Sequence, residues 1–143
     1  MAINSSKRSF QGVKFYMAKE SRYWKDWLDK ADKDLQRVEK RLENGDIEDA
    51  AFHLQQAVEK YLKGYLLSKG WKFKPVHDLE RLLDDAVQFD SDFERFRGIC
   101  QEITSYYTEE RYPYFVSEPS REEVAEALKL AKELVKRILE EIK

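Results

Sequence analysis

The chain has 143 residues, a formal net charge of −2 and a sequence isoelectric point of about 5.8. This length corresponds to one ordinary domain, and an aromatic content of 13% supplies enough apolar surface to exclude intrinsic disorder. The charge balance excludes an overall basic field that would attract nucleic acid, although a local basic patch is compatible with it. A content of 38% charged residues, with only 5 Gly and 3 Pro, favours amphipathic helices.

Residues 1–20 are expected to form a flexible N-terminal arm or extension, because the stretch up to Tyr16 is polar and basic and has no helical periodicity. No apolar run approaches the roughly 20 residues that span a bilayer, and the N-terminus lacks the apolar segment of a signal peptide. Cys100 is the only cysteine, so no disulfide can form within the chain. We therefore expect a cytoplasmic protein in which Cys100 is a buried helix residue.

Residues 21–143 are predicted to form a single helical domain. Its first helix runs from about Ser21, a candidate N-cap, to Glu43, and Asn44-Gly45 ends it. Apolar residues recur along this helix at helical spacing and define the face that should be buried. They are Trp24, Trp27, Leu28, Ala31, Leu35, Val38 and Leu42.

A second helix is predicted from Asp46, as its N-cap, to about Lys69, with Gly70 ending it. Its apolar residues also recur at helical spacing. Because the link between the first two helices is short, they should form an antiparallel hairpin.

Three more helices complete the expected domain. A short helix spans about Leu79 to Phe89, and Ser91 is the expected N-cap of the next. The segment Arg111 to Pro119 should be irregular, because Pro113 and Pro119 lack the amide proton that a helix interior uses. Ser120 followed by Glu123 is a capping box that begins the last helix.

The pattern as a whole predicts an all-α fold, an up-and-down four-helix bundle with one additional short helix. The residues expected to be largely buried lie on the apolar faces of four of these helices. They are Trp27, Leu54, Val58, Leu62, Ile99, Ile103 and Leu128.

Three segments of the chain resemble a known family. The run Ala51–Lys63 (AFHLQQAVEKYLK) has an aromatic residue, paired glutamines, an alanine, Glu-Lys and a second lysine. It is followed by Val76–Leu79 (VHDL) and then by Arg111–Pro113 (RYP). In this order the segments resemble the HEPN family (higher eukaryotes and prokaryotes nucleotide-binding domain) of the prokaryotic minimal type, with Val76 where the family has Thr.

The resemblance implies a helical bundle that often dimerises, in a family divided between ribonucleases and non-catalytic nucleotide-binding or partner-binding members. Many prokaryotic members are encoded beside a minimal nucleotidyltransferase and act with it as toxin and antitoxin. The ribonucleases carry an Arg followed, after four to six residues, by a His. Neither His53 nor His77 has an Arg at that distance before it, and no His follows Arg111. The chain therefore lacks the family's ribonuclease motif.

The second helix carries a polar stripe made of Gln56, Glu59, Lys60 and Lys63. In one interpretation Glu59 and Lys63 form an exposed surface pair that contributes about 0.2–0.5 kcal/mol. In the other, which the resemblance suggests, the stripe borders a ligand groove where the lysines lie near a phosphate and the glutamine amide reads a base. Both interpretations stay open at the level of sequence.

Three further positions have similar alternatives. His77 either organises the loop before the cap at Asp78, or serves as a hydrogen-bond donor or proton carrier near a helix N-terminus. Arg111 with Tyr112 and its aromatic neighbours either packs a loop onto the bundle or forms a stacking platform with Arg111 on a phosphate. His53 should be a helix-surface or interface residue. No metal site or cofactor is expected, because no ligands are grouped.

These observations lead to three hypotheses. The first is a non-catalytic HEPN binding module that partners a separately encoded minimal nucleotidyltransferase and binds a nucleotide. The second is a divergent, metal-independent ribonuclease that uses Arg111 and His77. The third is a structural protein-interaction domain.

A symmetric homodimer is also predicted, because the chain has more large apolar residues than a four-helix core should need. The second helix or the segment from Tyr112 to Val116 should contribute to the dimer interface. The surplus residues on which this prediction rests are Tyr61, Tyr65, Phe89, Phe93, Tyr114 and Phe115.

Overall fold

The computed structural model describes residues 21–106 and 119–142. These residues form α-helices and one 3₁₀ helix, with no strand among them, which confirms the predicted all-α bundle. None of the described helices is both long and apolar enough to cross a membrane. In chain order the elements are α1 (Trp24–Glu43), α2 (Ile47–Ser68), α3 (Leu79–Phe89), the 3₁₀ helix η2 (Ser91–Phe96), α4 (Arg97–Ser105) and α5 (Arg121–Ile142).

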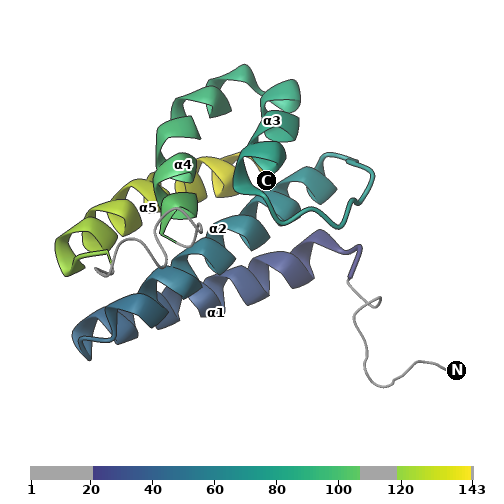
Figure 1. Ribbon diagram of the computed structural model, residues 1–143. Coiled ribbons are helices and arrows are strands. Elements are labelled where there is room, and N and C mark those ends of the chain that lie inside the picture. The colour runs from purple at the N-terminus through teal and green to yellow at the C-terminus, as the bar shows by residue number, and fades with distance from the viewer. Residues whose placement is uncertain (1–20, 107–118, 143) are drawn as a thin grey trace, which may run out of the picture.

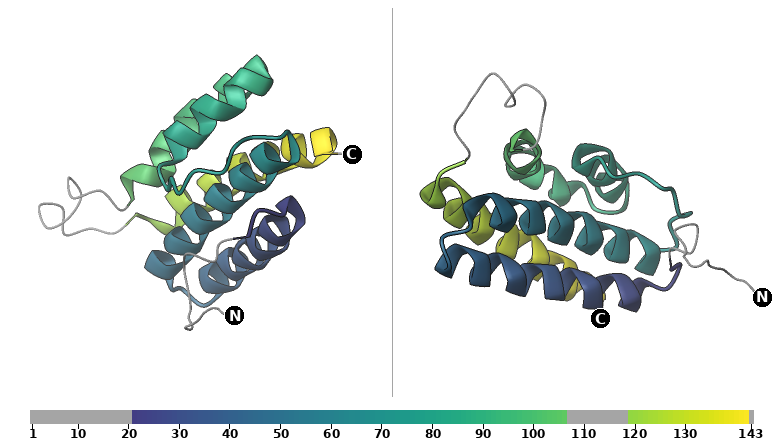
Figure 2. Two further views of the ribbon diagram at one scale, coloured as in Figure 1. Left: turned by 90° about the vertical axis from the view of Figure 1, so that its right-hand side faces the viewer. Right: turned by 60° about the horizontal axis from the view of Figure 1, so that its bottom comes forward.

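The helix α2 lies at the centre of the bundle. It pairs with α1 as an antiparallel hairpin and also contacts α3, α4 and α5 (Figure 1). The other two views show that α3 and α4 stand together on the far side of α2 from α1 (Figure 2). One surface of α2 therefore lies between α1 and the loop that leads into α3.

The ends of the first two helices follow local sequence chemistry, with one exception. Gly45 and Gly70 adopt left-handed φ angles of +79° and +86°, and the Asp46 side chain caps α2 as predicted. Ser21 does not cap α1, which begins two residues later than predicted, after Tyr23. The Ser21 hydroxyl instead accepts a hydrogen bond from the Tyr23 amide and donates one to the Asp26 carboxylate.

The prediction that Ser91 caps the fourth helix is wrong. Asp90 is the capping residue, and its carboxylate accepts a hydrogen bond from the Asp92 amide at 3.0 Å. The next turn is 3₁₀, and α4 begins only at Arg97. The same carboxylate pairs with Arg137 of α5. Hydrogen bonds with Glu141, with the Asp92 amide and with Arg137 lower the pKa of Asp90 to about 2.

The last helix begins with the predicted capping box. The Ser120 hydroxyl accepts a hydrogen bond from the Glu123 amide at 3.0 Å, and the Glu123 carboxylate accepts one from the Ser120 amide at 2.8 Å. This reciprocal pair fixes the point at which the chain enters α5.

The core confirms the apolar stripes of the helices, since all seven residues expected to be buried are buried. Cys100 is also fully buried, and burial raises the pKa of its thiol to about 12. Tyr61, Tyr65 and Phe93 are buried within their own chain, so they do not form the surplus that the dimer argument assumed. Tyr61 and Tyr65 are covered because α2 is in contact with α1, α3, α4 and α5. Of the described residues in that argument, only Phe89 stays exposed.

Several predictions lie outside the described residues. They concern the N-terminal arm over residues 1–20 and most of the irregular segment from Arg111 to Pro119, which includes Tyr112, Tyr114 and Phe115.

Candidate functional site

A buried ion pair lies on the surface of α2 that faces the loop before α3. Lys63 donates a hydrogen bond from Nζ to Oε2 of Glu59 at 2.9 Å, within one turn of the helix. Lys63 is 0% exposed and Glu59 is 5% exposed. The interpretation of this pair as an exposed surface pair is therefore wrong. The two residues are covered because the start of α1 and the loop after α2 fold over them.

Aromatic rings form the cover over Lys63. Its Nζ lies 5.0 Å from the ring centroid of Trp27 and 5.9 Å from that of Phe73, within the range of cation–π attraction. The Phe73 ring stacks on Trp27 with centroids 6.0 Å apart, and the guanidinium of Arg22 lies 4.7 Å from the Phe73 centroid. The ammonium thus has a carboxylate on one side and aromatic faces on the other.

His77 joins this ion pair from the loop that precedes α3. Its Nδ1 lies 2.7 Å from Oε2 of Glu59, the same oxygen that accepts from Lys63. Since an ionised carboxylate only accepts, the proton in this contact belongs to Nδ1. The His77 side chain is nevertheless 68% exposed. Among residues 21–106 and 119–142, its Nε2 has no hydrogen-bond partner.

The loop geometry explains how His77 reaches α2. The side chain of the following residue, Asp78, caps α3 by accepting a hydrogen bond from the Glu80 amide at 2.9 Å. The cap fixes the chain direction immediately after His77, while the contact with Glu59 fixes the ring. Organising the loop and presenting a nitrogen to solvent are therefore compatible roles for this residue.

Two successive glutamines, Gln55 and Gln56, extend the hydrogen-bond network around Glu59. Gln55 donates to the second oxygen of Glu59 at 3.4 Å, and Gln56 donates to the Gln55 amide oxygen at 2.8 Å. Gln56, which was predicted as a site residue, thus reaches Glu59 only through Gln55. The contribution of Gln55 was missed, although its i to i+4 spacing from Glu59 could have indicated it.

Lys60, another predicted site residue, points toward α1 instead. Its Nζ lies 2.5 Å from Oδ2 of Asp34, a carboxylate that is only 3% exposed. His53 contacts the other oxygen of Asp34 through Nδ1 at 2.9 Å, and its Nε2 lies 3.4 Å from Asp49. Lys60 and His53 therefore belong to a second cluster that joins α1 to α2.

Asp34 was not identified from the sequence, although a signal was present. It follows Ala31 by three residues and precedes Val38 by four, so it interrupts the apolar face of α1. A carboxylate on an apolar face needs partners when it is buried, and His53 and Lys60 supply them. Phe73 and Arg22 were also missed. The alternation of lysine and aromatic residues from Lys72 to Lys74 was a hint for Phe73 only.

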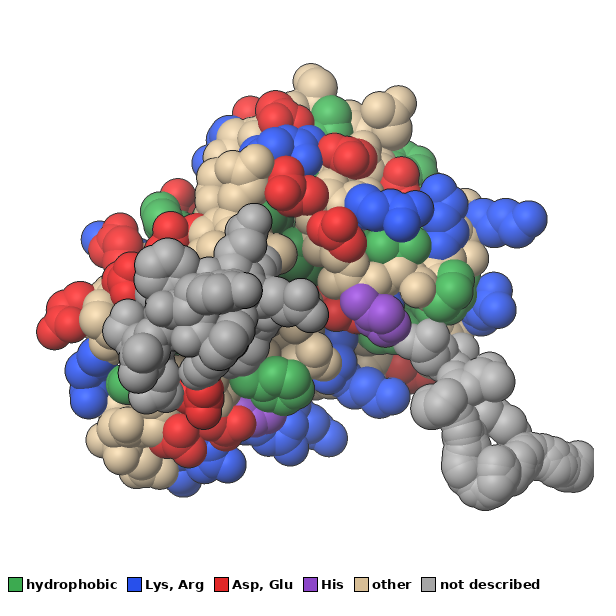
Figure 3. Space-filling view, viewed as in Figure 1, with side chains coloured by type: hydrophobic (Ala, Val, Ile, Leu, Met, Phe, Trp, Pro, Cys, Tyr) green, Lys and Arg blue, Asp and Glu red, His purple; other side chains and the backbone are tan. Residues whose placement is uncertain are grey.

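The structure assigns the predicted site residues to three groups. Glu59, Lys63 and His77 converge, with Gln56 at the edge, while Lys60 lies in the cluster around Asp34. Arg111 and Tyr112 lie outside the described residues. No group of acidic residues, histidines and cysteine suited to a metal ion occurs in residues 21–106 and 119–142. Acidic and basic side chains are mixed around the histidines on the face drawn in Figure 3, so that face has no field of one sign.

The structure thus defines a small helical bundle in which a buried carboxylate–lysine pair on the central helix holds a histidine of the loop before α3. The model of the HEPN domain matches residues 24–142, and the chain belongs to the HEPN family. A comparison with curated proteins gives no match.

Two solved structures resemble the chain over most of its length. One is ST0689, an archaeal HEPN homologue, with a TM-score of 0.65 and 26% identity over 85% of this chain and 98% of that one. The other is TT1696 from Thermus thermophilus, with a TM-score of 0.64 and 29% identity over 82% of this chain and 96% of that one. Both agree with the prokaryotic type that the sequence motifs indicated.

Proposed function

We propose that the chain is a non-catalytic HEPN binding module that binds a nucleotide at His77 and works with a separately encoded minimal nucleotidyltransferase. Nucleotide binding is proposed because the His77 side chain is both exposed and held in one orientation. Its ring is 68% exposed, yet Nδ1 is held 2.7 Å from the buried carboxylate of Glu59. A ring held in this way presents Nε2 to a ligand with little loss of side-chain freedom.

The chemistry around His77 suits the phosphate of a nucleotide. When both ring nitrogens carry a proton, Nε2 donates a charge-assisted hydrogen bond to a phosphate oxygen. His77 also lies directly before the N-terminus of α3, where the helix dipole favours an anion. The amide of Gln56 lies on the same stripe and is a candidate for contact with the base. Lys63 supports the site indirectly, because its ammonium is buried against Glu59.

The two histidines of the chain supply a matched test of this site. Both contact a carboxylate through Nδ1, but the side chain of His53 is 15% exposed and that of His77 is 68% exposed. Calorimetric titration with ATP and with AMP should show binding to the wild type and to His53→Asn. Loss of one charge-assisted hydrogen bond should weaken binding to His77→Asn by about 10- to 100-fold. Equal binding by both variants would refute the site.

Glu59 should act as a positioning residue, which a second variant can test. Glu59→Gln keeps the side-chain shape but removes the charged acceptor of His77 and Lys63. The ¹⁵N chemical shifts of the His77 ring should then move toward those of a free imidazole, and nucleotide affinity should fall. If affinity falls while the ring shifts stay unchanged, Glu59 does not act through His77.

The nucleotidyltransferase partnership rests on membership of the HEPN family and on the absent ribonuclease motif. It is tested by co-expressing the chain with a minimal nucleotidyltransferase encoded beside it and by measuring co-purification and the affinity of the pair. A pair that fails to associate at micromolar concentration removes this part of the proposal without affecting nucleotide binding.

A second candidate function is the divergent ribonuclease, which the Glu59–His77 contact also favours. A histidine held by a carboxylate can take up and release a proton at Nε2. Arg111 would have to lie at the same phosphate. Cleavage of single-stranded RNA that is lost in both His77→Ala and Arg111→Ala would favour this candidate over the binding module. No cleavage by the wild type, or cleavage that survives both substitutions, removes it.

The homodimer remains a proposal, and fewer exposed apolar residues support it than the sequence suggested. Among the described residues, Phe52 on α2 and Phe89 at the end of α3 are 44% and 45% exposed. Light scattering at micromolar concentration should give about twice the mass of one chain, which is 17.1 kDa. A mass of one chain at all concentrations would exclude the dimer. The third hypothesis, a structural interaction domain, is favoured if no nucleotide binds.

A further inference from the structure

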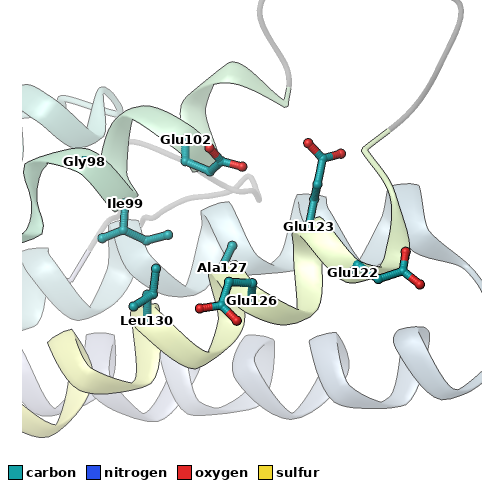
Figure 4. A pocket seen from close by; sticks show the side chains of 8 residues that line it. All are labelled: Gly98, Ile99, Glu102, Glu122, Glu123, Glu126, Ala127 and Leu130. Carbon is teal, nitrogen blue, oxygen red and sulfur yellow. The ribbon is translucent and has the colours of Figure 1, made fainter.

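A groove of about 440 Å³ lies between α4 and α5, away from the cluster around His77. Ile99 of α4 and Leu130 of α5 face each other across it, and Ala127 lies on the floor (Figure 4). Gly98 widens the α4 side, because a Cβ built on it would meet nothing within 4 Å. Leu130 is among the few large apolar residues that are exposed on the described surface. Between Ile99 and Leu130 the groove therefore offers an apolar slot that an aliphatic side chain could enter.

Carboxylates surround this apolar slot. Glu102 and Glu123 lie on either side of the opening, and Glu122 and Glu126 add two more from α5 (Figure 4). None of the described residues that line the groove is a lysine or arginine. Glu122 and Glu126 form no ion pair with any residue in the described ranges.

The nearest basic residue along α4 does not neutralise this rim. Arg97 directs its guanidinium to Asp84 at 2.7 Å and to Glu94 at 2.7 Å, on the side of α3 and η2. These hydrogen bonds raise the pKa of Arg97 still further above its ordinary value. The guanidinium therefore pairs with Asp84 and Glu94 and not with the glutamates of the groove. Within residues 21–106 and 119–142, Glu122 and Glu126 thus keep carboxylates without an ion-pair partner, which an apolar partner surface alone would not compensate.

The charge also argues against a second copy of the chain in this groove. A symmetric contact places the same surface on both subunits, so glutamates would face glutamates. Like charges brought together at an interface disfavour association. A partner must therefore carry the opposite charge beside an aliphatic group.

We propose that the groove between α4 and α5 binds a basic amphipathic segment of a partner protein. One aliphatic side chain of that segment enters between Ile99 and Leu130 over Gly98. Its flanking lysines or arginines pair with Glu102, Glu122 and Glu126. This surface is separate from His77, so the proposal stands whether or not a nucleotide binds there.

The test uses the full-length chain and a fluorescently labelled, acetylated peptide whose leucines recur at helical spacing among lysines and alanines. Fluorescence anisotropy should show binding that weakens as salt is raised. The same peptide with glutamate in place of lysine should not bind.

Two variants locate the binding surface. Gly98→Leu fills the slot and should weaken binding at least about tenfold, because the new side chain occupies the space of the peptide's aliphatic group. The double charge reversal Glu122→Lys with Glu126→Lys should weaken binding by a similar factor. Its matched control is Glu133→Lys with Glu140→Lys, which reverses two exposed charges of the same helix outside the groove and should bind like the wild type. Circular dichroism checks that every variant keeps its helices.

Four results would overturn the proposal. They are no binding of the lysine peptide to the wild type, unchanged binding by Gly98→Leu, equal loss in the control reversal, and binding of the glutamate peptide. A further result would assign a different occupant. If the wild type binds no peptide, but does so after Lys7, Arg8 and Lys14 are changed to glutamate, the basic N-terminal segment of the chain itself fills the groove and no partner segment is needed.

Discussion

The buried Glu59–Lys63 pair can be tested by replacing Lys63 with methionine. Methionine keeps most of the aliphatic stem but removes the ammonium that lies 2.9 Å from the Glu59 carboxylate. Lys63 is 0% exposed, so water cannot replace the lost partner. Removing one partner of a buried ion pair costs about 3–5 kcal/mol. His77 still contacts Glu59, which places the expected loss at the lower end, about 3 kcal/mol.

Urea unfolding followed by circular dichroism measures this loss. With an m-value of roughly 2 kcal/mol/M, a loss of about 3 kcal/mol lowers the unfolding midpoint by about 1.5 M. The double variant Glu59→Gln with Lys63→Met should recover part of the loss, since no charge is then left buried without a partner.

Lys60→Met is the control for this argument. Lys60 also pairs with a buried carboxylate, but Asp34 keeps His53 at 2.9 Å and Arg37 at 3.5 Å when Lys60 is removed. We expect a loss of only about 1 kcal/mol. If Lys63→Met unfolds within about 1 kcal/mol of the wild type, or if Lys60→Met is equally damaging, burial does not determine the strength of these pairs.

Four further predictions concern packing, reactivity and pH. Gly64→Ala should destabilise the fold by about 1 kcal/mol in urea, because the new Cβ would lie 2.7 Å from the Leu28 side chain and 3.3 Å from a backbone oxygen of α1. Gly98→Ala, which has open space, should instead stabilise it by about 0.5–1 kcal/mol. Cys100, whose pKa is raised to about 12, should resist iodoacetamide at pH 8 in the native protein and react in urea, as mass spectrometry would reveal. Folding lowers the pKa of Asp90 from 3.8 to about 2. The stabilising contribution of Asp90 is therefore present above pH 3.8 and is lost as the pH falls toward 2. Urea unfolding of Asp90→Asn should lack this part of the acid sensitivity.

The helices could be predicted from sequence because their signals are local. Apolar periodicity, the glycines at helix ends and the Ser120–Glu123 capping box each act within a few residues of the structure they specify. The error at Ser91 has a different origin. Asp90 caps that turn while it also pairs with Arg137 on α5, a residue 47 positions away. A contact of that kind leaves no periodic trace in the sequence.

The site was predictable in part for the same reason. Glu59 and Lys63 are four residues apart on a helix, so their contact follows from helical geometry. Their burial does not, because the cover comes from Trp27 and Phe73 at distant positions. Lys60 was grouped with them by proximity along the chain. Successive helix residues are rotated by about 100°, and this rotation directs Lys60 toward α1 while Glu59 faces His77.

The two histidines differ in exposure and in the number of carboxylates that they contact. His53 contacts carboxylates through both ring nitrogens, Asp34 at 2.9 Å and Asp49 at 3.4 Å, and so joins α1 to α2. His77 uses one nitrogen on Glu59 and leaves the other at the surface. Because the fold supplies the same carboxylate contact in both places, the proposed function and the difference in exposure lead us to expect that substitution of His77 changes binding more than stability.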